Sequence, residues 1–449
     1  MTSTPEFRGA VHQNLYLAEG GQEVHAVITV DTETGRGEGS APDSSGPAAA
    51  EVLILDCSGS MGHPPEKIVK AKEAAAVAID ELRDGVPFAL VAGSSGARML
   101  WPGEPTLMPA DEQTRDAART ALRRLSADGG TTIGAWLRLA GQLLGHRREA
   151  IRHAILLTDG RNEHESPEDL AAAVADCTGQ FSCDCRGVGT DWSVAELRTI
   201  ASALLGTVGL VAEPADLADD FRTMMATSMR KGVGEVGLRL WTPVGAAVRF
   251  VKQAAPTLED LTSRRVGSDP QTGDYPTGSW GAESRDYHIC IEIEPGHVGE
   301  EKLACRAMFV HPGADGTPPQ PLGQAFSHTE PDGSTSVHPS ALVRAFWTDD
   351  LARATTFNDK VAAVTGRAEL ARAVQDGLEA HRCGDDGRAV DHLRRARGLA
   401  EQCQDASVLG WLDQIYDPDS GTIGLHKMSA REGMELDIES TRTTPLRRG

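Results

Sequence analysis

The sequence predicts an α/β protein in which a doubly wound, mainly parallel sheet is inserted into a β-sandwich and followed by a C-terminal helical bundle. Three observations support this prediction. Residues 51–231 alternate short apolar runs with stretches of helical apolar spacing, which is typical of a doubly wound sheet. The segments 1–31 and 232–339 show the period-two alternation of antiparallel strands separated by Gly, Pro and Asp loops. Residues 340–416 return to helical spacing.

The N-terminal segment, residues 1–31, is expected to form a hairpin. Apolar residues alternate before and after the pair Gly20-Gly21, which is typical of two strands joined by a tight turn. A lone hairpin is only marginally stable, so we assign it to the β-sandwich at 232–339. Residues 32–50 are rich in Gly, Ser and Pro and are expected to be a flexible linker.

The segment 51–231 reads as strands alternating with helices. The expected strands cover 52–55, 88–92, 97–101, 155–159, 181–187 and 208–212. The expected helices cover 65–83, 111–125, 194–204 and 215–229, with two more opened by Gly129–Thr132 and by Ser166. Ligands of such sheets bind at the carboxyl ends of the strands, where we therefore look for a site.

Oxygen-bearing side chains gather at two of these strand ends. The first expected strand ends in Asp56-Cys57-Ser58-Gly59-Ser60, which sets one carboxylate and two hydroxyls at alternate positions. An extended turn with this spacing can aim three oxygens at one point. These are hard donors, suited to Mg²⁺ or Mn²⁺ and poor for Zn²⁺. Two later stretches, Gly129-Gly130-Thr131-Thr132 and Thr158-Asp159, add a hydroxyl before a helix and a carboxylate after a buried strand.

The order D-x-S-x-S, then G-G-T, then L-T-D-G resembles the metal-ion-dependent adhesion site of von Willebrand factor A (VWA) domains, over about residues 51–229. The resemblance implies that Mg²⁺, or else Mn²⁺ or Ca²⁺, is held by Asp56, Ser58, Ser60, Thr131 and Asp159. Thr131 is preferred to Thr132 because it follows the glycine pair, as in the family's pattern. Some VWA proteins are fused to a β-sandwich in a similar arrangement. The alternative to a working metal site is a VWA scaffold that keeps these residues without using the metal.

Composition narrows the class of partner. The chain has 44 basic and 65 acidic residues among 449, a net charge of −21. Recognition of phosphate needs clustered Lys and Arg, so we expect no nucleic acid and no membrane partner. No apolar run approaches the roughly 18 residues needed to span a bilayer, and the first residues do not resemble a signal peptide. With eight scattered cysteines interpreted as reduced thiols, the sequence predicts a cytoplasmic protein.

The expected function is non-enzymatic. The VWA resemblance implies a metal-dependent protein–protein binding module, an intracellular adaptor or assembly subunit, in which Mg²⁺ coordinates an Asp or Glu carboxylate of the protein partner. The alternative is a metal-assisted hydrolase. That reading requires a general base, and the loops near the site offer only the isolated histidines His63 and His164. The sequence has no P-loop, G-x-S-x-G, H-E-x-x-H or Rossmann motif.

The C-terminal part, residues 340–416, is expected to form helices over 341–355, 359–381, 387–402 and 406–415. The turn around Ala380–Val390 resembles that of a tetratricopeptide hairpin, but one copy is weak evidence and a helical bundle is the simpler interpretation. Residues 417–449 are expected to be a flexible tail. Its segment Glu435–Pro445 resembles the phosphothreonine peptides read by forkhead-associated domains, with phosphorylation expected between Ser440 and Thr444, which suggests a phosphothreonine-reading partner. A tail without a role is the alternative.

Overall fold

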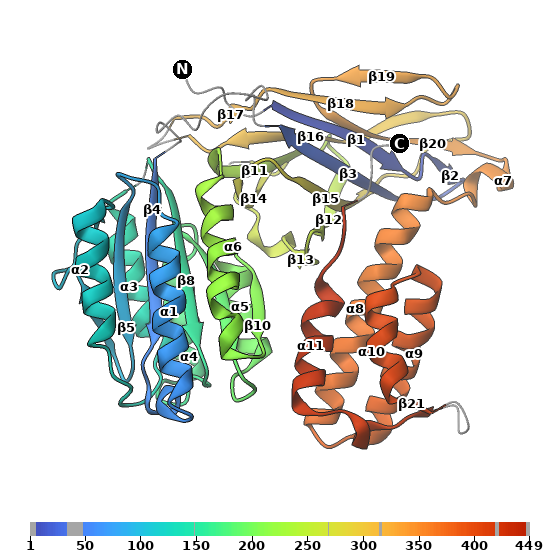
Figure 1. Cartoon of the computed structure of the whole chain (residues 1–449). Coiled ribbons are helices and arrows are strands. Elements are labelled where there is room, and N and C mark those ends of the chain that lie inside the picture. The colour runs from blue at the N-terminus through green and yellow to red at the C-terminus, as the bar shows by residue number, and fades with distance from the viewer. Residues whose placement is uncertain are drawn as a thin grey trace. The chain divides into compact units, whose positions relative to one another are not determined.

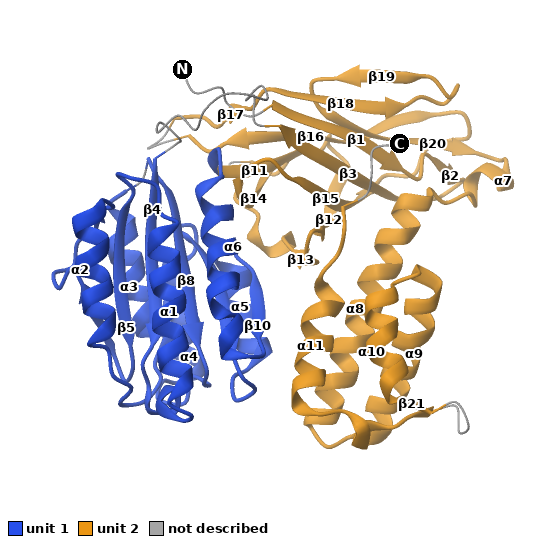
Figure 2. Ribbon diagram, in the orientation of Figure 1, with its two compact units in different colours: residues 1–2, 36–234 blue, residues 3–35, 235–449 orange. Residues whose placement is uncertain are grey.

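The chain forms two compact units, the second of which is built from two separate stretches (Figure 2). The structure, a computed structural model, describes residues 6–33, 48–147, 149–267, 269–313, 317–417 and 422–445. Unit 1 comprises residues 36–234, and unit 2 comprises 3–35 together with 235–449. Unit 1 is therefore inserted within unit 2, and the predicted fold class is confirmed. Most of the predicted linker, residues 34–47, lies outside the described residues.

Unit 1 is organised around a mainly parallel sheet with strand order β10-β9-β8-β4-β5-β6 (Figure 1). Its strands are β4 (Ala49–Asp56), β5 (Pro87–Gly93), β6 (Ala97–Trp101), β8 (Ile151–Thr158), β9 (Ser182–Val188) and β10 (Val208–Val211). Only β6 and the short β7 (Met108–Pro109) run antiparallel to their neighbour β5. The central strand β4 is buried along its whole length, as expected for a parallel strand covered on both faces.

Helices cover both faces of this sheet (Figure 1). One face packs in a single hydrophobic core against α1 (Glu66–Asp80), α2 (Glu112–Arg123) and α6 (Leu217–Met229). The helices α3 (Ile133–Gly145), α4 (Pro167–Cys177) and α5 (Val194–Ala203) contact one another in series on the other face. Short 3₁₀ turns, η1 (Gly59–Gly62) and η2 (Pro214–Asp216), precede α1 and α6. Capping signals set helix starts; α4 begins after Ser166, whose hydroxyl accepts from the N–H of Asp169.

The connections after β4 and β8 leave the sheet in opposite directions. The chain passes from β4 through α1 to β5 on one side, and from β8 through α4 to β9 on the other. This divergence between two adjacent parallel strands marks a switch point of the sheet, and ligands of doubly wound sheets bind in the crevice at the carboxyl ends of such strands. Asp56 is the last residue of β4, and Asp159 directly follows β8. The fold therefore brings the two predicted carboxylate ligands to the same crevice.

The sandwich of unit 2 has two sheets, with strand orders β13-β12-β15-β3-β1-β18-β19 and β14-β11-β16-β20-β2, and β17 pairs with β16. The N-terminal strands are β1 (Glu6–Gln13), β2 (Tyr16–Ala18) and β3 (Glu23–Glu33). The later strands are β11 (Val233–Trp241), β12 (Ala246–Ala255), β13 (Glu259–Asp260), β14 (Thr272–Trp280), β15 (Ser284–Ile293), β16 (Glu301–His311), β17 (Gln320–Pro321), β18 (Gln324–Thr329), β19 (Thr335–His338) and β20 (Ala341–Thr348), with a 3₁₀ turn η3 (Thr262–Arg264).

Aromatic rings from both sheets fill the interior of the sandwich. Phe7 of β1 stacks on Phe309 of β16 with ring centroids 5.3 Å apart, and Trp280 of β14 meets Phe7 edge-on at 5.1 Å. All three rings are fully buried. Such pairs add to the free energy of area burial, so the N-terminal strand is a full member of this core.

The predicted N-terminal hairpin is formed by β1 and β3, which pair antiparallel from Glu6↔Glu33 to Gln13↔Ala26. One detail differs from the prediction. The segment expected to be its first strand, around Leu15 and Leu17, leaves this ladder, and β2 pairs in parallel with β20 in the other sheet. The chain therefore crosses between the two sheets before the glycine turn.

The predicted helix over 341–355 is wrong. Residues Ala341–Thr348 form β20, and only Leu351–Ala354 form a short helix, α7. Buried and half-buried positions alternate strictly along β20, since its buried residues face the sandwich interior beside β16. The sandwich consequently extends past residue 339, and the helical region begins later than predicted.

The helical region consists of α8 (Asp359–Arg382), α9 (Asp386–Cys403), α10 (Ala406–Ile415) and α11 (Ala430–Thr441), with the 3₁₀ turn η4 (Leu425–Lys427) and the short pair β21 (Tyr416–Asp417) and β22 (Thr422–Ile423). A left-handed Gly384 closes the turn between α8 and α9. These elements share one apolar cluster that includes Leu378, Leu393, Leu412 and Leu436. Helices of this number and length fit the predicted bundle.

The flexible tail predicted for 417–449 is wrong for its described residues 417 and 422–445. Helix α11 begins with a capping box between Ser429 and Glu432, and it buries Leu436 against the bundle. After α11 the chain pairs with the sandwich, since the N–H of Thr443 donates to the carbonyl of Pro256 (2.8 Å). Ser440 is buried and donates to the Asp437 carbonyl.

Two further predictions concern environment. All eight cysteines are free thiols in the structure. Among the helices that the structure describes, none combines the length and apolar character that a bilayer crossing requires.

Candidate metal centre

Asp56 is fixed in place at the end of β4 by two hydrogen bonds. Its Oδ1 accepts from the backbone N–H of Ser58 (2.7 Å), and its Oδ2 accepts from the hydroxyl of Thr158 (2.6 Å). Burial disfavours the charged carboxylate, and the neighbouring charge of Asp159 adds to this effect, so the pKa of Asp56 is raised to about 6. A cation beside Asp56 relieves both effects, which is why such an environment favours metal binding.

The two serines connect the ends of β4 and β8. The Oγ atoms of Ser58 and Ser60 are 3.0 Å apart, and the Ser60 hydroxyl donates to Oδ1 of Asp159 (2.7 Å). Ser58 and Asp159 are buried, whereas Ser60 is exposed. This chain of hydroxyls leads from the buried carboxylates to solvent.

Thr131 arrives from a third loop, between α2 and α3. The hydroxyls of Ser60 and Thr131 both lie close to Gly160, just after β8. A side chain at this position would place its Cβ atom 3.6 Å from Ser60 Oγ and 3.7 Å from Thr131 Oγ1, so the two hydroxyls converge beside the strand end. Thr132 is engaged elsewhere, because its hydroxyl donates to the carbonyl of Ser94 (3.0 Å). The structure thus brings the five predicted residues together at one crevice.

His164 holds the Thr131 loop. The N–H of Thr131 donates to Nδ1 of His164 (3.2 Å), and the Thr131 carbonyl accepts from the N–H of His164 (3.1 Å). The Nδ1 of His63 lies 3.4 Å from the carbonyl of Gly59, so this ring also serves the backbone of a site loop. Each histidine therefore positions a loop, and the Nδ1 of each is engaged.

Lys67, in the first turn of α1, belongs to the centre although the sequence pattern did not predict it. Its Nζ donates to Oδ2 of Asp159 at 2.7 Å, and the side chain is only 11% exposed. The exposed carboxylate of Asp191 is 3.9 Å from the same nitrogen. The available signal was positional, because side chains of a first turn point back toward the loop that precedes the helix.

The residues fit a hard divalent cation. Asp56, Ser58, Ser60, Thr131 and Asp159 supply only carboxylate and hydroxyl oxygens, the donors that Mg²⁺ prefers. With both carboxylates ionised, the ammonium of Lys67 leaves one net negative charge among buried groups. A divalent cation can balance that charge, whereas a soft metal finds no sulfur or nitrogen ligand among these five side chains.

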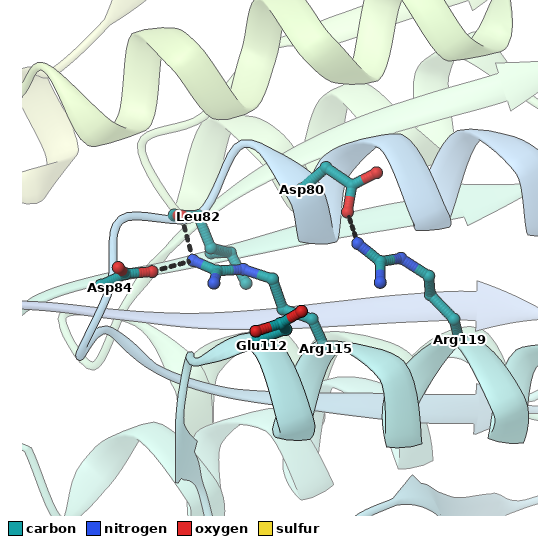
Figure 3. Close-up of a pocket in the computed structure, with 6 residues that line it drawn as sticks. All are labelled: Asp80, Leu82, Asp84, Glu112, Arg115 and Arg119. Carbon is teal, nitrogen blue, oxygen red and sulfur yellow. Dashed lines mark hydrogen bonds and ion pairs between the residues drawn. The ribbon is translucent and has the colours of Figure 1, made fainter.

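A hollow in unit 1, between the C-terminal end of α1 and α2, has a structural role (Figure 3). Arg115 donates to the carbonyl of Leu82 (2.7 Å) and pairs with Asp84 (2.7 Å), and Arg119 pairs with Asp80. The Arg115 guanidinium hydrogen-bonds to a carbonyl beyond the last turn of α1. Both cations offset the partial negative charge at the C-terminal end of this helix. The hollow is explained by helix packing and contains none of the five oxygen donors.

Comparison with known proteins identifies similar chains. The von Willebrand factor type A domain family matches residues 50–209. A solved structure, von Willebrand factor type A from Catenulispora acidiphila, is 45% identical, with a TM-score of 0.89 over 99% of this chain and 98% of the other. The ArnB paralog VWA2 from Sulfolobus acidocaldarius has a similar fold, with a TM-score of 0.60 at 12% identity over 98% of both chains.

A curated relative, an uncharacterized protein of Synechocystis sp., is 29% identical over 234 residues, which is 50% of this chain. The match covers 53% of that relative, so the chain spans about half the length of the curated protein.

Proposed function

Because this chain belongs to the von Willebrand factor type A family, we propose that it is a non-enzymatic, metal-dependent protein-binding module. Its centre at Asp56, Ser58, Ser60, Thr131 and Asp159 holds a divalent cation, Mg²⁺ in the first instance, and recognises an Asp or Glu carboxylate of a protein partner. VWA domains commonly work in this way.

One observation supports the proposal above the others. Oxygen donors from three separate loops meet at the ends of β4 and β8, where the connections to the next strands leave in opposite directions. One of these donors, Ser60, is exposed. A cation bound there supplies a positive coordination position for an incoming carboxylate. The two buried aspartates provide the negative charge that attracts the cation, and the serines set the spacing between the strand ends.

Thr131 and Lys67 are each held in place beside the centre by hydrogen bonds. The loop that carries Thr131 is held by His164, whose ring Nδ1 accepts from the N–H of Thr131 and whose own N–H donates to the Thr131 carbonyl. Lys67 holds the outer oxygen of Asp159 and keeps this carboxylate oriented toward the loop of Ser60.

Calorimetric titration with Mg²⁺ tests the metal site. We expect one Mg²⁺ to bind wild type and Asp191→Asn, whose exposed carboxylate lies near Lys67 without belonging to the donor set. Asp56→Asn, which keeps the side-chain shape, should lose this binding while the protein stays folded by circular dichroism. Equal Mg²⁺ binding in Asp56→Asn and wild type would contradict the site.

Partner capture tests the binding function. A protein retained by the wild-type chain in Mg²⁺ should be released by chelator, and it should not bind Asp56→Asn in the same buffer. Retention that is equal in all three conditions would contradict recognition through the metal. The rival hydrolase predicts turnover of phosphoester or peptide substrates in Mg²⁺ that Asp56→Asn abolishes, and such turnover would replace the proposal.

The setting proposed for this function is a cytoplasmic adaptor or assembly subunit, with no nucleic acid and no membrane as partner. The net charge of −21 supports the expectation that neither nucleic acid nor membrane is a partner, since acidic surfaces repel phosphate. A phosphothreonine-reading partner stays a proposal for Thr444, which is exposed. Ser440 is buried, and the hydroxyls of Thr441 and Thr443 donate to the carbonyls of Ile438 and Ala254.

A further inference from the structure

A second cluster of metal-ligand side chains lies in unit 2, on the sheet that contains β3 and β15. His25 of β3 is directly opposite Cys290 of β15 in the antiparallel ladder, so their side chains share one face. Glu23 precedes His25 by two residues and lies on the same face. Each of the three offers one ligand atom, and these atoms all lie within 4.8 Å of one another.

The separations are close to those of a tetrahedral zinc site. The Nε2 of His25 is 3.7 Å from Sγ of Cys290 and 4.0 Å from Oε2 of Glu23. Typical zinc–ligand bonds at tetrahedral angles place nitrogen and sulfur about 3.6 Å apart, and nitrogen and oxygen about 3.4 Å apart. The first pair already fits. The second requires a small rotation of the Glu23 side chain, which is 57% exposed and able to turn.

His288 completes the arrangement behind His25. Its Nε2 lies 3.3 Å from Nδ1 of His25, the ring nitrogen that faces away from Cys290. In the neutral tautomer of His288 that carries its proton on Nδ1, Nε2 accepts a hydrogen bond from the Nδ1–H of His25. Metal-binding histidines typically donate their second N–H to an acceptor in this way, which fixes the tautomer and the ring plane.

Phe250 of β12 packs against both imidazoles, with ring centroids 5.9 Å from His25 and 4.9 Å from His288. This contact restricts both rings. Glu292, opposite Glu23 in the ladder, is paired with Arg249 at 3.3 Å, so the free carboxylate of the cluster is the one that Glu23 provides.

We propose that Glu23, His25 and Cys290 form a zinc site, with His288 as a positioning residue and the fourth coordination place open to water. Sulfur, imidazole nitrogen and carboxylate oxygen together form a donor set that suits Zn²⁺ and that Mg²⁺ disfavours. The two metal sites of the chain therefore differ in ligand chemistry: hard oxygens in unit 1, and a mixed set in unit 2.

The chemistry of binding gives this site a signature of its own. A cysteine side chain is mainly a protonated thiol at neutral pH. Zinc binds the thiolate, and coordination transfers that proton to the buffer as the Zn–S bond forms. Zinc binding at neutral pH therefore releases about one proton.

The position of the site suggests a role as a clip. His25 belongs to the stretch 3–35, whereas Cys290 belongs to the stretch 235–449, and unit 1 is inserted between them in the chain. A metal that joins these strands closes a long loop and stabilises the discontinuous unit 2, since it binds the folded chain more tightly than the unfolded one.

Cobalt substitution tests the proposal on the full chain. With one equivalent of Co²⁺, we expect a sulfur-to-cobalt charge-transfer band in the near ultraviolet and intense visible bands of tetrahedral Co²⁺, and Zn²⁺ should displace both. The band should persist in Asp56→Asn, which removes the oxygen site, and in Cys383→Ser, which removes an exposed thiol. It should be absent in Cys290→Ser.

Two further variants address folding and positioning. Glu23→Gln changes only an exposed side chain, so it keeps the fold, and it should weaken Zn²⁺ binding while the charge-transfer band persists at higher Co²⁺. His288→Phe keeps a buried ring without an acceptor and should weaken Zn²⁺ binding by about 10- to 100-fold. Absence of the band in wild type, its retention in Cys290→Ser, or Zn²⁺ affinity unchanged in both Glu23→Gln and His288→Phe would overturn the proposal.

Discussion

Lys67 sets the electrostatics of the metal centre at the scale of single residues. Its ammonium contacts a carboxylate oxygen of Asp159, so one of the two negative charges in the crevice already has a permanent partner. A divalent cation that enters the crevice gains attraction from both aspartates and meets repulsion from Lys67. Lys67 thus lowers metal affinity and, at the same time, stabilises the metal-free fold.

The substitution Lys67→Met separates these two effects. Because the repulsion disappears, Mg²⁺ should bind at least about tenfold more tightly, about 1.4 kcal/mol. The metal-free variant should be less stable, since a buried carboxylate loses its partner, and Mg²⁺ should restore its melting temperature. Titration calorimetry and thermal unfolding measure both quantities. Lys70→Met, on a half-buried lysine of the same helix that pairs with Glu73, is the control, and equal Mg²⁺ affinities in the two variants would refute this role of Lys67.

Residues close together in sequence were predictable as site residues, whereas residues that meet only in the folded chain were not. Asp56, Ser58 and Ser60 were predictable because they lie within five residues, where local spacing fixes their common direction. Lys67 was not, because its contact with Asp159 joins residues that are distant in sequence and depends on how α1 packs beside β8. The proposed zinc site was not predicted for the same reason, since His25 and Cys290 meet only through the register of β3 and β15.

At the scale of elements, a buried ion network links three neighbouring strands of unit 1. His153 of β8 contacts Glu51 of β4 through Nδ1 (2.8 Å) and Asp184 of β9 through Nε2 (3.1 Å). Burial opposes protonation of the ring, but the two carboxylates outweigh it and raise the pKa of His153 to about 10. The ring is therefore charged at neutral pH and connects β4, β8 and β9 through side chains as well as through the backbone.

This network predicts how stability depends on pH. The unfolded histidine has a pKa of about 6.5, so between pH 6.5 and 10 the folded protein binds a proton that the unfolded chain has lost. The contribution of His153 is complete below that range and disappears as pH rises through it. Urea unfolding should show His153→Gln less stable by about 3–5 kcal/mol at pH 6, with the difference from wild type shrinking by pH 9. Parallel pH curves for the two proteins would contradict this assignment.

Two elements were wrongly predicted, and both errors have a physical origin. The segment of β20 reads Ala-Leu-Val-Arg-Ala-Phe-Trp-Thr, in which apolar residues satisfy helical and strand periods alike. Pairing with β16 and β2 decides in favour of the strand, and this is tertiary information. Helix α11 had a local signal in the capping box of Ser429 and Glu432, but its composition is polar, and its stability comes from packing on α8 and α10.

At the scale of the whole molecule, the insertion makes the stability of the two units unequally dependent on the N-terminus. In the sheet order, β3 lies between β15 and β1, so unit 2 loses an internal strand without residues 1–33. Deletion of these residues should abolish amide protection in β15, while β4 and β8 of unit 1 stay protected, because their partners all lie within 36–234. Hydrogen-exchange mass spectrometry measures both. Undiminished protection of β15 in the truncated chain would show that β3 is dispensable.

The insertion of unit 1 also determines the order in which the strands of unit 2 are synthesised on the ribosome. β3 is synthesised about 250 residues before β15, its neighbour in the sheet, which at roughly 5–20 residues per second is a delay of roughly 12 to 50 seconds. During that time unit 1 emerges complete and can fold, while β1 and β3 present unpaired edges and the apolar ring of Phe7. β1 and β3 are thus made before unit 1, yet they reach their complete native pairing only after unit 1 and β15 have been synthesised.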